Sequence, residues 1–398
     1  ISVYQIGQIN GQFLHNQGFR GQDMQIAILD GGFLNVDSFF AFDSLWSNNQ
    51  ILGTKDFVSP ATPFFTTDDH GMNVLSCIGG NVPGNLIGSA PKASFWLIRS
   101  EDTGSEYIIE EDNWVAAAEF ADSVGVDIIN SSVGYCTFSD PATNHTYADM
   151  DGKTTRVTRG ANTAASRGIL VFSSAGNEGD KNWKYIIAPS DGDFVIGVGA
   201  VKRDSVATDF TSLGPASDGD VKPNVSALGK QTFMQKSSGL LGYRDGTSFS
   251  SPLLAGMAAC LWQAHPHATA AQVKSAMEQS GHLFDKPDPL LGYGIPDMHR
   301  ANILLMNLKT QSIDFRKKWM VYPNPVTDIL VLQNTGTVVV ERVTLSFFSL
   351  DGRLLHVERL TGASKIVLSD LHSLPAGLFI LKIDTGNSSE SFKISKAF

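Results

Sequence analysis

The sequence contains little cysteine and no long apolar segment. Its 398 residues include three cysteines, Cys77, Cys136 and Cys260, which are widely separated and lack the close Cys and His spacing of a zinc site. We expect buried free thiols, which fit any cellular compartment. The longest apolar run, residues 253–262, is about ten residues long, against the roughly 18 that a membrane helix needs. The sequence therefore predicts neither a disulfide framework nor a transmembrane segment.

Positive charge is also scarce. Lys and Arg number 30 against 40 Asp and Glu, which gives a formal net charge of −10. This balance argues against nucleic acid or an anionic membrane as the main partner. Hydrophobic residues make up 42% and charged residues 18%, which is typical of a folded globular chain. The sequence starts with ISVYQIGQ, without the basic and apolar regions of an export signal, so we expect such a signal to be absent or already removed.

Apolar, β-branched runs alternate with helix-like segments from Gln25 to about Leu308. Strands of this kind, separated by helices, indicate a mostly parallel sheet with helices on both faces. The expected strands are residues 25–30, 94–100, 126–134, 168–176 and 193–201, and the expected helices are residues 110–125, 160–168, 250–265 and 269–280. Thr269 is expected to cap the last helix.

The composition changes after Leu308. Residues 309–318 are polar and basic, which is typical of a linker. Residues 319–398 contain short alternating strands separated by glycine-containing turns, which favours a small all-β sandwich. We therefore predict an α/β domain over residues 1–308, a linker over residues 309–318 and a β-sandwich over residues 319–398.

Two short segments could orient and activate a nucleophile. Asp30 ends the first apolar strand and precedes two glycines, so its carboxylate is well placed to orient a histidine; an ordinary Asp-Gly turn is the alternative. His70 precedes Gly71 at the start of an apolar helix, where each ring nitrogen can have a partner. A structural or surface histidine is the alternative there.

A third segment could supply the nucleophile itself. Ser248 lies at a helix start, where free backbone N–H groups favour developing negative charge. Pro252 is expected in the opening turn of that helix, where a missing N–H has little effect. The alternative is that Ser248 or Ser250 only caps the helix.

A fourth segment, SSAGNEG at residues 173–179, directly follows an apolar strand. The carboxyl ends of parallel strands are where α/β folds place their sites. A plain turn is the alternative, because Asn and Gly are common turn residues.

Together these segments resemble the subtilisin-like serine proteases, the subtilases, over roughly residues 1–308. Asp30, His70 and Ser248 follow the family's chain order, and the Gly-Thr-Ser-x-x-Ser-Pro pattern surrounds Ser248. The resemblance implies a subtilisin-like fold and an acyl-enzyme on Ser248, with His70 as general base and acid and Asp30 orienting it. It also implies that the side-chain amide of Asn177 and the backbone N–H of Ser248 bind the oxyanion.

The resemblance also implies where a substrate binds. One segment would form an antiparallel edge along which an extended peptide adds as a strand: Ser131, Ser132, Val133 and Gly134. The opposite wall of the pocket would consist of Ser174, Ala175 and Gly176. Ile187 would lie near the pocket floor. Residues 101–114 are a candidate lining of the groove, with Tyr107 as a wall, although a helix start capped by Thr103 and Glu106 explains that segment as well.

Two positions depart from the family pattern. Gly31 stands where a Ser or Thr is usual, which removes a hydroxyl hydrogen bond near the Asp30 carboxylate, and Asn224 stands where Asp is usual. The implied chemistry requires no cofactor, and no metal ligand is predicted. Many subtilases hold a structural calcium ion, and the sequence leaves one open without identifying its site. The available carboxylates also fit a solvated acidic surface; they are Asp37, Asp43, Asp68 and Asp69.

The C-terminal residues resemble the sorting domain of the Bacteroidetes type IX secretion system. The resemblance rests on Tyr-Pro-Asn-Pro at residues 322–325, Asp-Gly at 351–352 and Pro-Ala-Gly at 375–377. An ordinary β-sandwich accessory domain is the alternative. The resemblance implies export across both membranes by that machinery, acting on residues 319–398, followed by release or attachment at the cell surface.

These patterns predict a secreted serine endopeptidase that acts on proteins and peptides and has no nucleic-acid partner. The alternative hypothesis is a catalytically silent surface protein that binds a partner on a subtilase scaffold, because fold and function are separable. The presence of all four site residues, Asp30, His70, Asn177 and Ser248, argues against that alternative.

Overall fold

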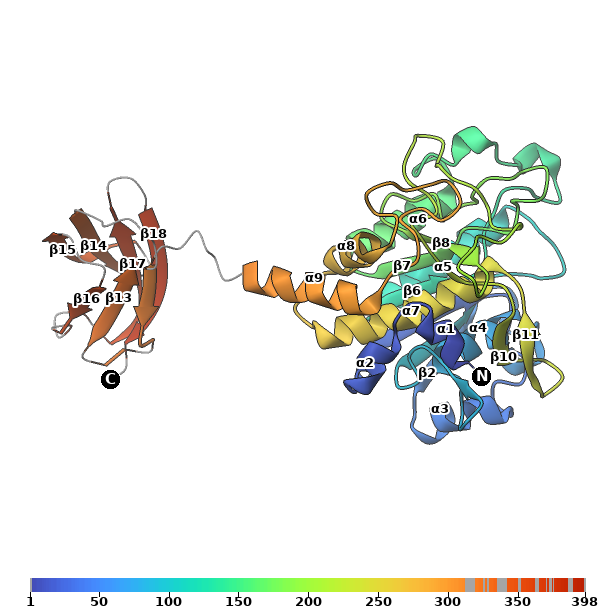
Figure 1. The fold of residues 1–398 in the computed structure, drawn as a ribbon, viewed down its shortest axis with the longest axis horizontal. Helices are drawn as coiled ribbons and strands as arrows, with labels where there is room; N and C mark the ends of the chain where they lie inside the picture. The colour runs from blue at the N-terminus through green and yellow to red at the C-terminus, as the bar shows by residue number, and fades with distance from the viewer. Residues whose placement is uncertain are drawn as a thin grey trace. The chain divides into compact units, whose positions relative to one another are not determined.

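The chain divides into two compact units, Ile1–Asn307 and Leu308–Phe398, which are described separately below (Figure 1). The computed structural model describes residues 2–311, 319–324, 326–327, 329–334, 342–349, 352–361, 365–369, 371, 374, 376–385 and 389–396. Helix α9, Met298–Gln311, includes the first three residues of the expected linker. The rest of that linker, residues 312–318, lies outside the described residues.

A seven-stranded parallel sheet forms the centre of the N-terminal unit, in the order β2-β5-β1-β6-β7-β8-β9. Its strands are β1 Gln25–Asp30, β2 Ile51–Asp56, β5 Ser94–Arg99, β6 Ile128–Ser131, β7 Leu170–Ser174, β8 Ile196–Val201 and β9 Val225–Leu228. The five strands expected from the sequence are all present, and the two additional ones lie at the sheet edges. The predicted parallel α/β fold is confirmed.

Helices cover both faces of this sheet. One face packs against α4, His70–Gly79, and α7, Thr247–Ala264, with α8, Ala270–Ser280, and α9 in the same core. The other face packs against α5, Ile109–Ser123, and α6, Arg156–Ser166. Helix α7 is buried on all sides from Thr247 to Leu261, so its continuous apolar run is that of a core helix. Thr269 caps α8, as predicted.

Short elements complete the N-terminal unit. The helices are α1 Val3–Gly7, α2 Gln12–Asn16 and α3 Asp43–Ser47, and the 3₁₀ turns are Phe40–Phe42, Phe64–Thr66, Pro141–Thr143 and Tyr147–Asp149. Two small hairpins pair β3 Asn81–Val82 with β4 Leu86–Ile87, and β10 Thr232–Gln235 with β11 Leu241–Arg244.

Two antiparallel sheets form the described part of the C-terminal unit, in the orders β12-β13-β16 and β15-β14-β17-β18. Their strands are β12 Trp319–Tyr322, β13 Leu330–Asn334, β14 Arg342–Ser349, β15 Leu354–Thr361, β16 Lys365–Leu368, β17 Gly377–Asp384 and β18 Ser389–Lys396. Both sheets contribute to one apolar core that includes Leu332, Phe347 and Phe379. Buried and half-buried residues alternate along most of β14 and β17, as the sequence predicted for a sandwich.

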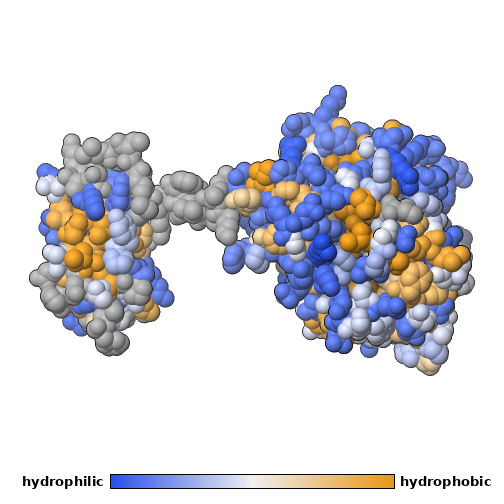
Figure 2. All heavy atoms as spheres, turned by 60° about the horizontal axis from the view of Figure 1, so that its bottom comes forward, coloured by the Kyte–Doolittle hydropathy of each residue, from blue (hydrophilic) through white to orange (hydrophobic). Residues whose placement is uncertain are grey.

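No helix in the described residues is long and apolar enough to span a membrane. On the N-terminal unit, hydrophilic residues cover much of the face seen in Figure 2, with smaller apolar groups between them.

Candidate active site

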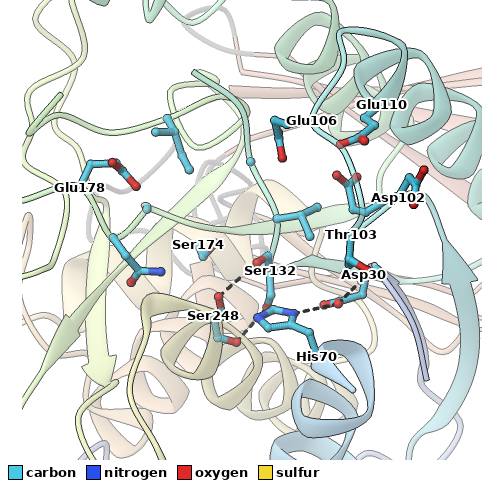
Figure 3. A pocket seen from close by; sticks show the side chains of 17 residues that line it. Asp30, His70, Asp102, Thr103, Glu106, Glu110, Ser132, Ser174, Glu178 and Ser248 are labelled. Atoms are coloured by element: carbon cyan, nitrogen blue, oxygen red, sulfur yellow. Dashed lines mark hydrogen bonds and ion pairs between the residues drawn. The ribbon is translucent and has the colours of Figure 1, made fainter. Parts of the chain in front are cut away.

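A pocket of about 300 Å³ lies where three neighbouring strands of the parallel sheet end (Figure 3). Asp30 is the last residue of β1, Ser132 directly follows β6, and Ser174 is the last residue of β7; all three line the pocket. His70, Asn177 and Ser248 line it as well, from three other segments. The structure therefore brings all four predicted active-site residues to the carboxyl edge of the sheet.

Asp30 and His70 form a hydrogen-bonded pair. His70 Nδ1 lies 2.8 Å from Asp30 Oδ1, and the His70 backbone N–H donates to Asp68 Oδ1 at 2.8 Å. The start of α4 can approach the end of β1 because residue 71 is glycine: a Cβ there would lie 2.5 Å from the Gly32 carbonyl oxygen. The predicted contact between Asp30 and His70 thus depends on the His-Gly sequence.

The environment of His70 changes its proton affinity. Burial works to lower the pKa of the imidazole, whereas the charge of Asp30 and its hydrogen bond raise it. Asp68 adds a smaller raising effect and Arg244 a lowering one, and the pKa ends above the usual histidine value. The His70 side chain is 29% exposed, so the ring also reaches the open pocket.

The second carboxylate oxygen of Asp30 is buried and has no hydrogen-bond partner among the described residues. Oδ1 accepts from both His70 and the backbone N–H of Gly31. Gly31 is the position where the family usually has a hydroxyl residue, and a Cβ there would lie 2.5 Å from Thr103 Cγ2. The methyl group of Thr103 therefore occupies the space that a residue-31 side chain would need.

Ser248 is the second residue of α7, whose N-cap is Gly246 with φ 149°. The capping alternative is therefore wrong, because neither Ser248 nor Ser250 holds the cap position. The Ser248 hydroxyl donates to the Ser132 carbonyl at 3.2 Å, and no hydrogen bond joins it to His70 in the described residues. Ser248 is nearly buried but faces the pocket.

We expected Pro252 in the opening turn of α7, but it lies beyond that turn because the helix begins at Thr247. As the sixth residue, Pro252 cannot donate to the carbonyl of Ser248, four residues earlier. The Ser132 hydroxyl donates to that carbonyl instead, at 2.9 Å. The proline thus creates a free acceptor that ties α7 to the segment after β6.

Two residues that sequence analysis missed hold Ser132 in place. Asn130 Nδ2 donates to the Ser132 hydroxyl at 3.1 Å, and Ser251 donates to Asn130 Oδ1 at 2.9 Å. Both are fully buried; Asn130 lies in β6 and Ser251 lies in α7. The pattern of a sequence can indicate that such residues are buried, but it does not show which side chains they contact.

Asn177 is held through its amide oxygen. Oδ1 accepts from the backbone N–H of Thr247 at 2.9 Å and from the Thr247 hydroxyl at 3.1 Å. Because a backbone N–H can only donate, this contact fixes which side of the amide faces Thr247. The NH₂ group is therefore the part of Asn177 left to meet a ligand in the pocket that it lines with Ser248.

The expected substrate-binding segments are only partly on the pocket surface. Ser132, Val133 and Gly134 line it on one side, and Ser174 and Gly176 on the other. Ser131 and Ala175 lie behind these walls; Ser131 accepts a hydrogen bond from Trp114 Nε1, and Ala175 packs with Ile186.

Ile187 lies between the two walls. A Cβ at Gly134 would be 2.9 Å from Ile187 Cδ1, and one at Gly176 would be 3.0 Å from Ile187 Cγ1. Ile187 itself lines the pocket, so its side chain limits the space between the walls.

Part of the segment 101–114 lines the pocket, as predicted, but neither the predicted helix cap nor the predicted role of Tyr107 is found. The helix begins at Ile109, so Thr103 and Glu106 do not cap it. Both instead line the pocket, whereas Tyr107 is half exposed and does not. Three further carboxylates of this segment also line the pocket: Glu101, Asp102 and Glu110.

The acidic residues available for calcium are occupied in part by protein contacts. Asp68 accepts from the His70 backbone, and Asp69 pairs with Arg244 at 3.2 Å. In the described part of the chain, no group of three or more His, Cys, Asp or Glu side chains could hold a metal ion.

Comparison with protein-family models matches residues 21–294 to the subtilase family and residues 320–397 to the secretion system C-terminal sorting domain. Among curated proteins, subtilisin NAT of Bacillus subtilis subsp. natto is 30% identical over 282 residues, which cover 70% of this chain and 65% of that protein. Subtilisin of Bacillus pumilus is 29% identical over 282 residues and is covered to 90%. The chain thus spans 65% of the length of the first of these relatives.

Solved structures show the same fold. The prenylagaramide maturation protease PagA superposes with a TM-score of 0.59 at 21% identity, over 74% of this chain and 98% of that one. MycP1 with its N-terminal propeptide removed superposes with a TM-score of 0.58 at 20% identity, over 75% of this chain and 96% of that one.

The sorting-domain match at the C-terminus implies secretion across the outer membrane through the type IX system. Because the family model spans well over half of the sequence, the chain belongs to the subtilase family of subtilisin-like serine peptidases.

Proposed function

We propose that the N-terminal unit is a serine endopeptidase that hydrolyses peptide bonds in proteins through an acyl-enzyme on Ser248. The observation that supports this most is the 2.8 Å pair of Asp30 and His70 in the same pocket as Ser248 and Asn177. A serine hydroxyl is a weak nucleophile at its own pKa, so it needs a base within reach. His70 is the candidate base.

The first step is attack of Ser248 Oγ on the substrate carbonyl carbon. Its proton moves to His70 Nε2, because Nδ1 is engaged with Asp30. For this step the hydroxyl leaves the Ser132 carbonyl by rotation about the Cα–Cβ bond of Ser248 and turns to the imidazole. Asp30 stabilises the imidazolium that forms and holds the ring in the tautomer that leaves Nε2 free.

The carbonyl oxygen becomes negatively charged as the new bond forms. The Asn177 amide NH₂ group and the backbone N–H of Ser248 are the donors proposed for it. Thr247 fixes the Asn177 amide before substrate arrives, so little reorganisation is needed at the moment of reaction.

The imidazolium then gives its proton to the leaving amine, and the C–N bond breaks. Water attacks the acyl-enzyme with His70 again as base, which releases the new carboxyl end and restores Ser248. The chain's own residues thus carry every proton transfer.

We also propose that the secreted protein is released from the cell or stays attached to its surface, with residues 319–398 recognised by the type IX machinery. The match of residues 320–397 to the sorting domain supports this part.

The proposal is tested with Ser248→Ala and Ser250→Ala. Ser250 lies in the same helix, is also buried and donates to the Thr247 carbonyl, so it is a matched control. We expect Ser248→Ala to lower kcat on casein by on the order of 10⁶, as removing the nucleophile does in a subtilisin, and Ser250→Ala to keep activity. A fluorophosphonate should label Ser248 stoichiometrically. A folded protein that neither turns over casein nor takes the label would favour the silent binding scaffold.

A further inference from the structure

One oxygen of the Asp30 carboxylate lacks a donor. Asp30 is fully buried, and its Oδ1 accepts from His70 Nδ1 and from the backbone N–H of Gly31, both at 2.8 Å. Its Oδ2 is buried as well, without a hydrogen-bond partner among the described residues. A buried acceptor without a donor is unfavourable, and more so when it carries charge. The carboxylate that orients the proposed base is therefore held on one oxygen only.

Thr103 lies next to this carboxylate (Figure 3). It lines the same pocket as Asp30 and Gly31, and a Cβ at Gly31 would lie 2.5 Å from its Cγ2. The methyl group of Thr103 thus stands where a side chain of residue 31 would otherwise lie. Residue 31 usually carries a hydroxyl in the family, so this chain lacks that hydroxyl and has a threonine from another segment in its place.

The Thr103 hydroxyl is available to serve Asp30. It makes no hydrogen bond in the part of the chain that the structure describes. The Oγ1 and Cγ2 atoms of a threonine occupy two of the three staggered positions on Cβ, so a turn of about 120° about the Cα–Cβ bond places Oγ1 where Cγ2 stands. Thr103 is an exposed residue, so this turn does not force its methyl group into the core.

We propose that Thr103 is a positioning residue for the pair of Asp30 and His70: its hydroxyl, turned into the place of its methyl group, donates to Asp30 Oδ2. A carboxylate held at both oxygens keeps one orientation, so Oδ1 stays on His70 Nδ1 while the imidazole gains and loses its proton. Thr103 thus replaces the hydroxyl that Gly31 removes. The inference rests on the proposed peptidase function, because Asp30 orients a base only if His70 serves Ser248.

Thr103→Val and Thr103→Ser test the hydroxyl, with an internally quenched peptide taken from a casein cleavage site. Valine keeps the shape of threonine without the donor, whereas serine keeps the donor without the methyl group. We expect Thr103→Val to lower kcat about tenfold with little change in KM, because the lost bond is to a charged group, and Thr103→Ser to stay within about twofold. Thr103→Val should also move the acid limb of kcat/KM to higher pH, because a carboxylate with one donor fewer attracts the imidazolium proton more strongly.

A second source of the hydroxyl makes the test specific. Gly31 is outside the left-handed region of φ, so its backbone allows serine, but Gly31→Ser alone should be poorly active because its Cβ meets the Thr103 methyl group at 2.5 Å. Thr103→Ala alone lacks the donor. The double variant removes that contact and returns a hydroxyl beside Asp30, so it should be more active than either single variant. Ser105→Ala is the matched control, because it removes a hydroxyl of the same segment that donates to Asp102, and it should change neither kcat nor the pH profile.

The positioning role and the peptidase function fail in different ways. Unaltered kcat and pH profile in Thr103→Val would overturn the role of Thr103 and leave the peptidase function standing. An equal loss in Thr103→Ser, or a double variant no more active than Thr103→Ala, would also overturn it, because the hydroxyl would not be the group responsible. If the unaltered protein neither cleaves casein nor takes a fluorophosphonate on Ser248, the peptidase function fails, and the role of Thr103 fails with it.

Discussion

The two units bury different kinds of side chain. The buried residues of the N-terminal unit include many polar and charged ones, among them Asp30, Glu101 and Lys222. In the described part of the C-terminal unit, the fully buried side chains are all apolar. Buried polar groups are unfavourable unless they are paired, so a fold keeps them where something depends on them.

In the N-terminal unit the buried polar groups fall into two kinds. Lys222 has every donor engaged, with the carbonyls of Gly192 and Val195 and the side chain of Asn224. Asp30 and Glu110 each keep a buried oxygen without a partner among the described residues, and both line the pocket. Four further buried oxygens without a partner among the described residues lie away from the pocket, on Gln8, Ser44, Thr208 and Gln235. The sandwich shows neither kind in its described core.

Deletion of residues 319–398 should have the largest effect, because it removes the function of one unit and leaves that of the other. We expect full peptidase activity per molecule and a complete loss of export, because the site residues all lie in the N-terminal unit. Activity assays on cell fractions and on medium measure both. Export of the truncated protein at the normal level would contradict the assignment of sorting to the sandwich.

Substitution Phe379→Ala should damage the sandwich alone. Phe379 is fully buried in an all-apolar core, so the cavity should lower the free energy of unfolding of that unit by about 3–5 kcal/mol. Thermal unfolding of the full chain, compared with the 319–398 deletion, identifies the affected transition. A parallel fall in kcat would show that the units are coupled.

Substitution Asn177→Ala should lower activity and leave stability nearly unchanged, which is the opposite of the result expected for Phe379→Ala. We expect kcat to fall by on the order of 10²–10³, as loss of the corresponding donor does in a subtilisin, with little change in thermal stability. Thr247→Val keeps the backbone N–H that holds Asn177 and removes only the hydroxyl contact, so its loss should be smaller. Equal losses in the two variants would mean that Asn177 acts only through Thr247.

The fold was predictable because its signals are local. Strand β1 has the predicted bounds, residues 25–30, and Thr269 caps α8 as the sequence indicates. The edge strand β2 was missed because its residues are mostly half-buried or exposed, without the continuous apolar run of a central strand. Helix α7 was expected over residues 250–265 but begins three residues earlier, at Thr247.

The site was predictable only where a motif marks it. Asp30, His70, Asn177 and Ser248 each lie in a short recognisable segment, and all four line one pocket. The carboxylates of Glu101, Glu106 and Glu110 carry no such motif: the sequence predicted only that their segment lines the groove, not which of its side chains reach the pocket. Their convergence depends on tertiary packing, which no spacing in the sequence encodes.

The pair of buried Asp30 and partly exposed His70 should also give the N-terminal unit a pH dependence that the apolar core of the sandwich lacks. Because the pKa of His70 is raised, the base should be protonated, and kcat/KM should fall, at a higher pH than the roughly 6.5 of an ordinary histidine. The stability contribution has the opposite sign: protonated His70 stabilises the fold below about pH 6.5, and this contribution is lost as pH rises through the raised pKa.

Two neighbouring charges sharpen that prediction, with the smallest expected effect. Asp68→Asn removes a charge that raises the pKa of His70, so the acid limb of kcat/KM should move to lower pH. Arg244→Gln removes a charge that lowers this pKa, so the limb should move to higher pH. Profiles of kcat/KM between pH 5 and 9 measure both shifts, and Lys181→Gln is a control because Lys181 pairs with Glu178, which lies across the pocket from Asp30 in Figure 3. Shifts in the same direction for Asp68→Asn and Arg244→Gln would mean that the limb reports a group other than His70.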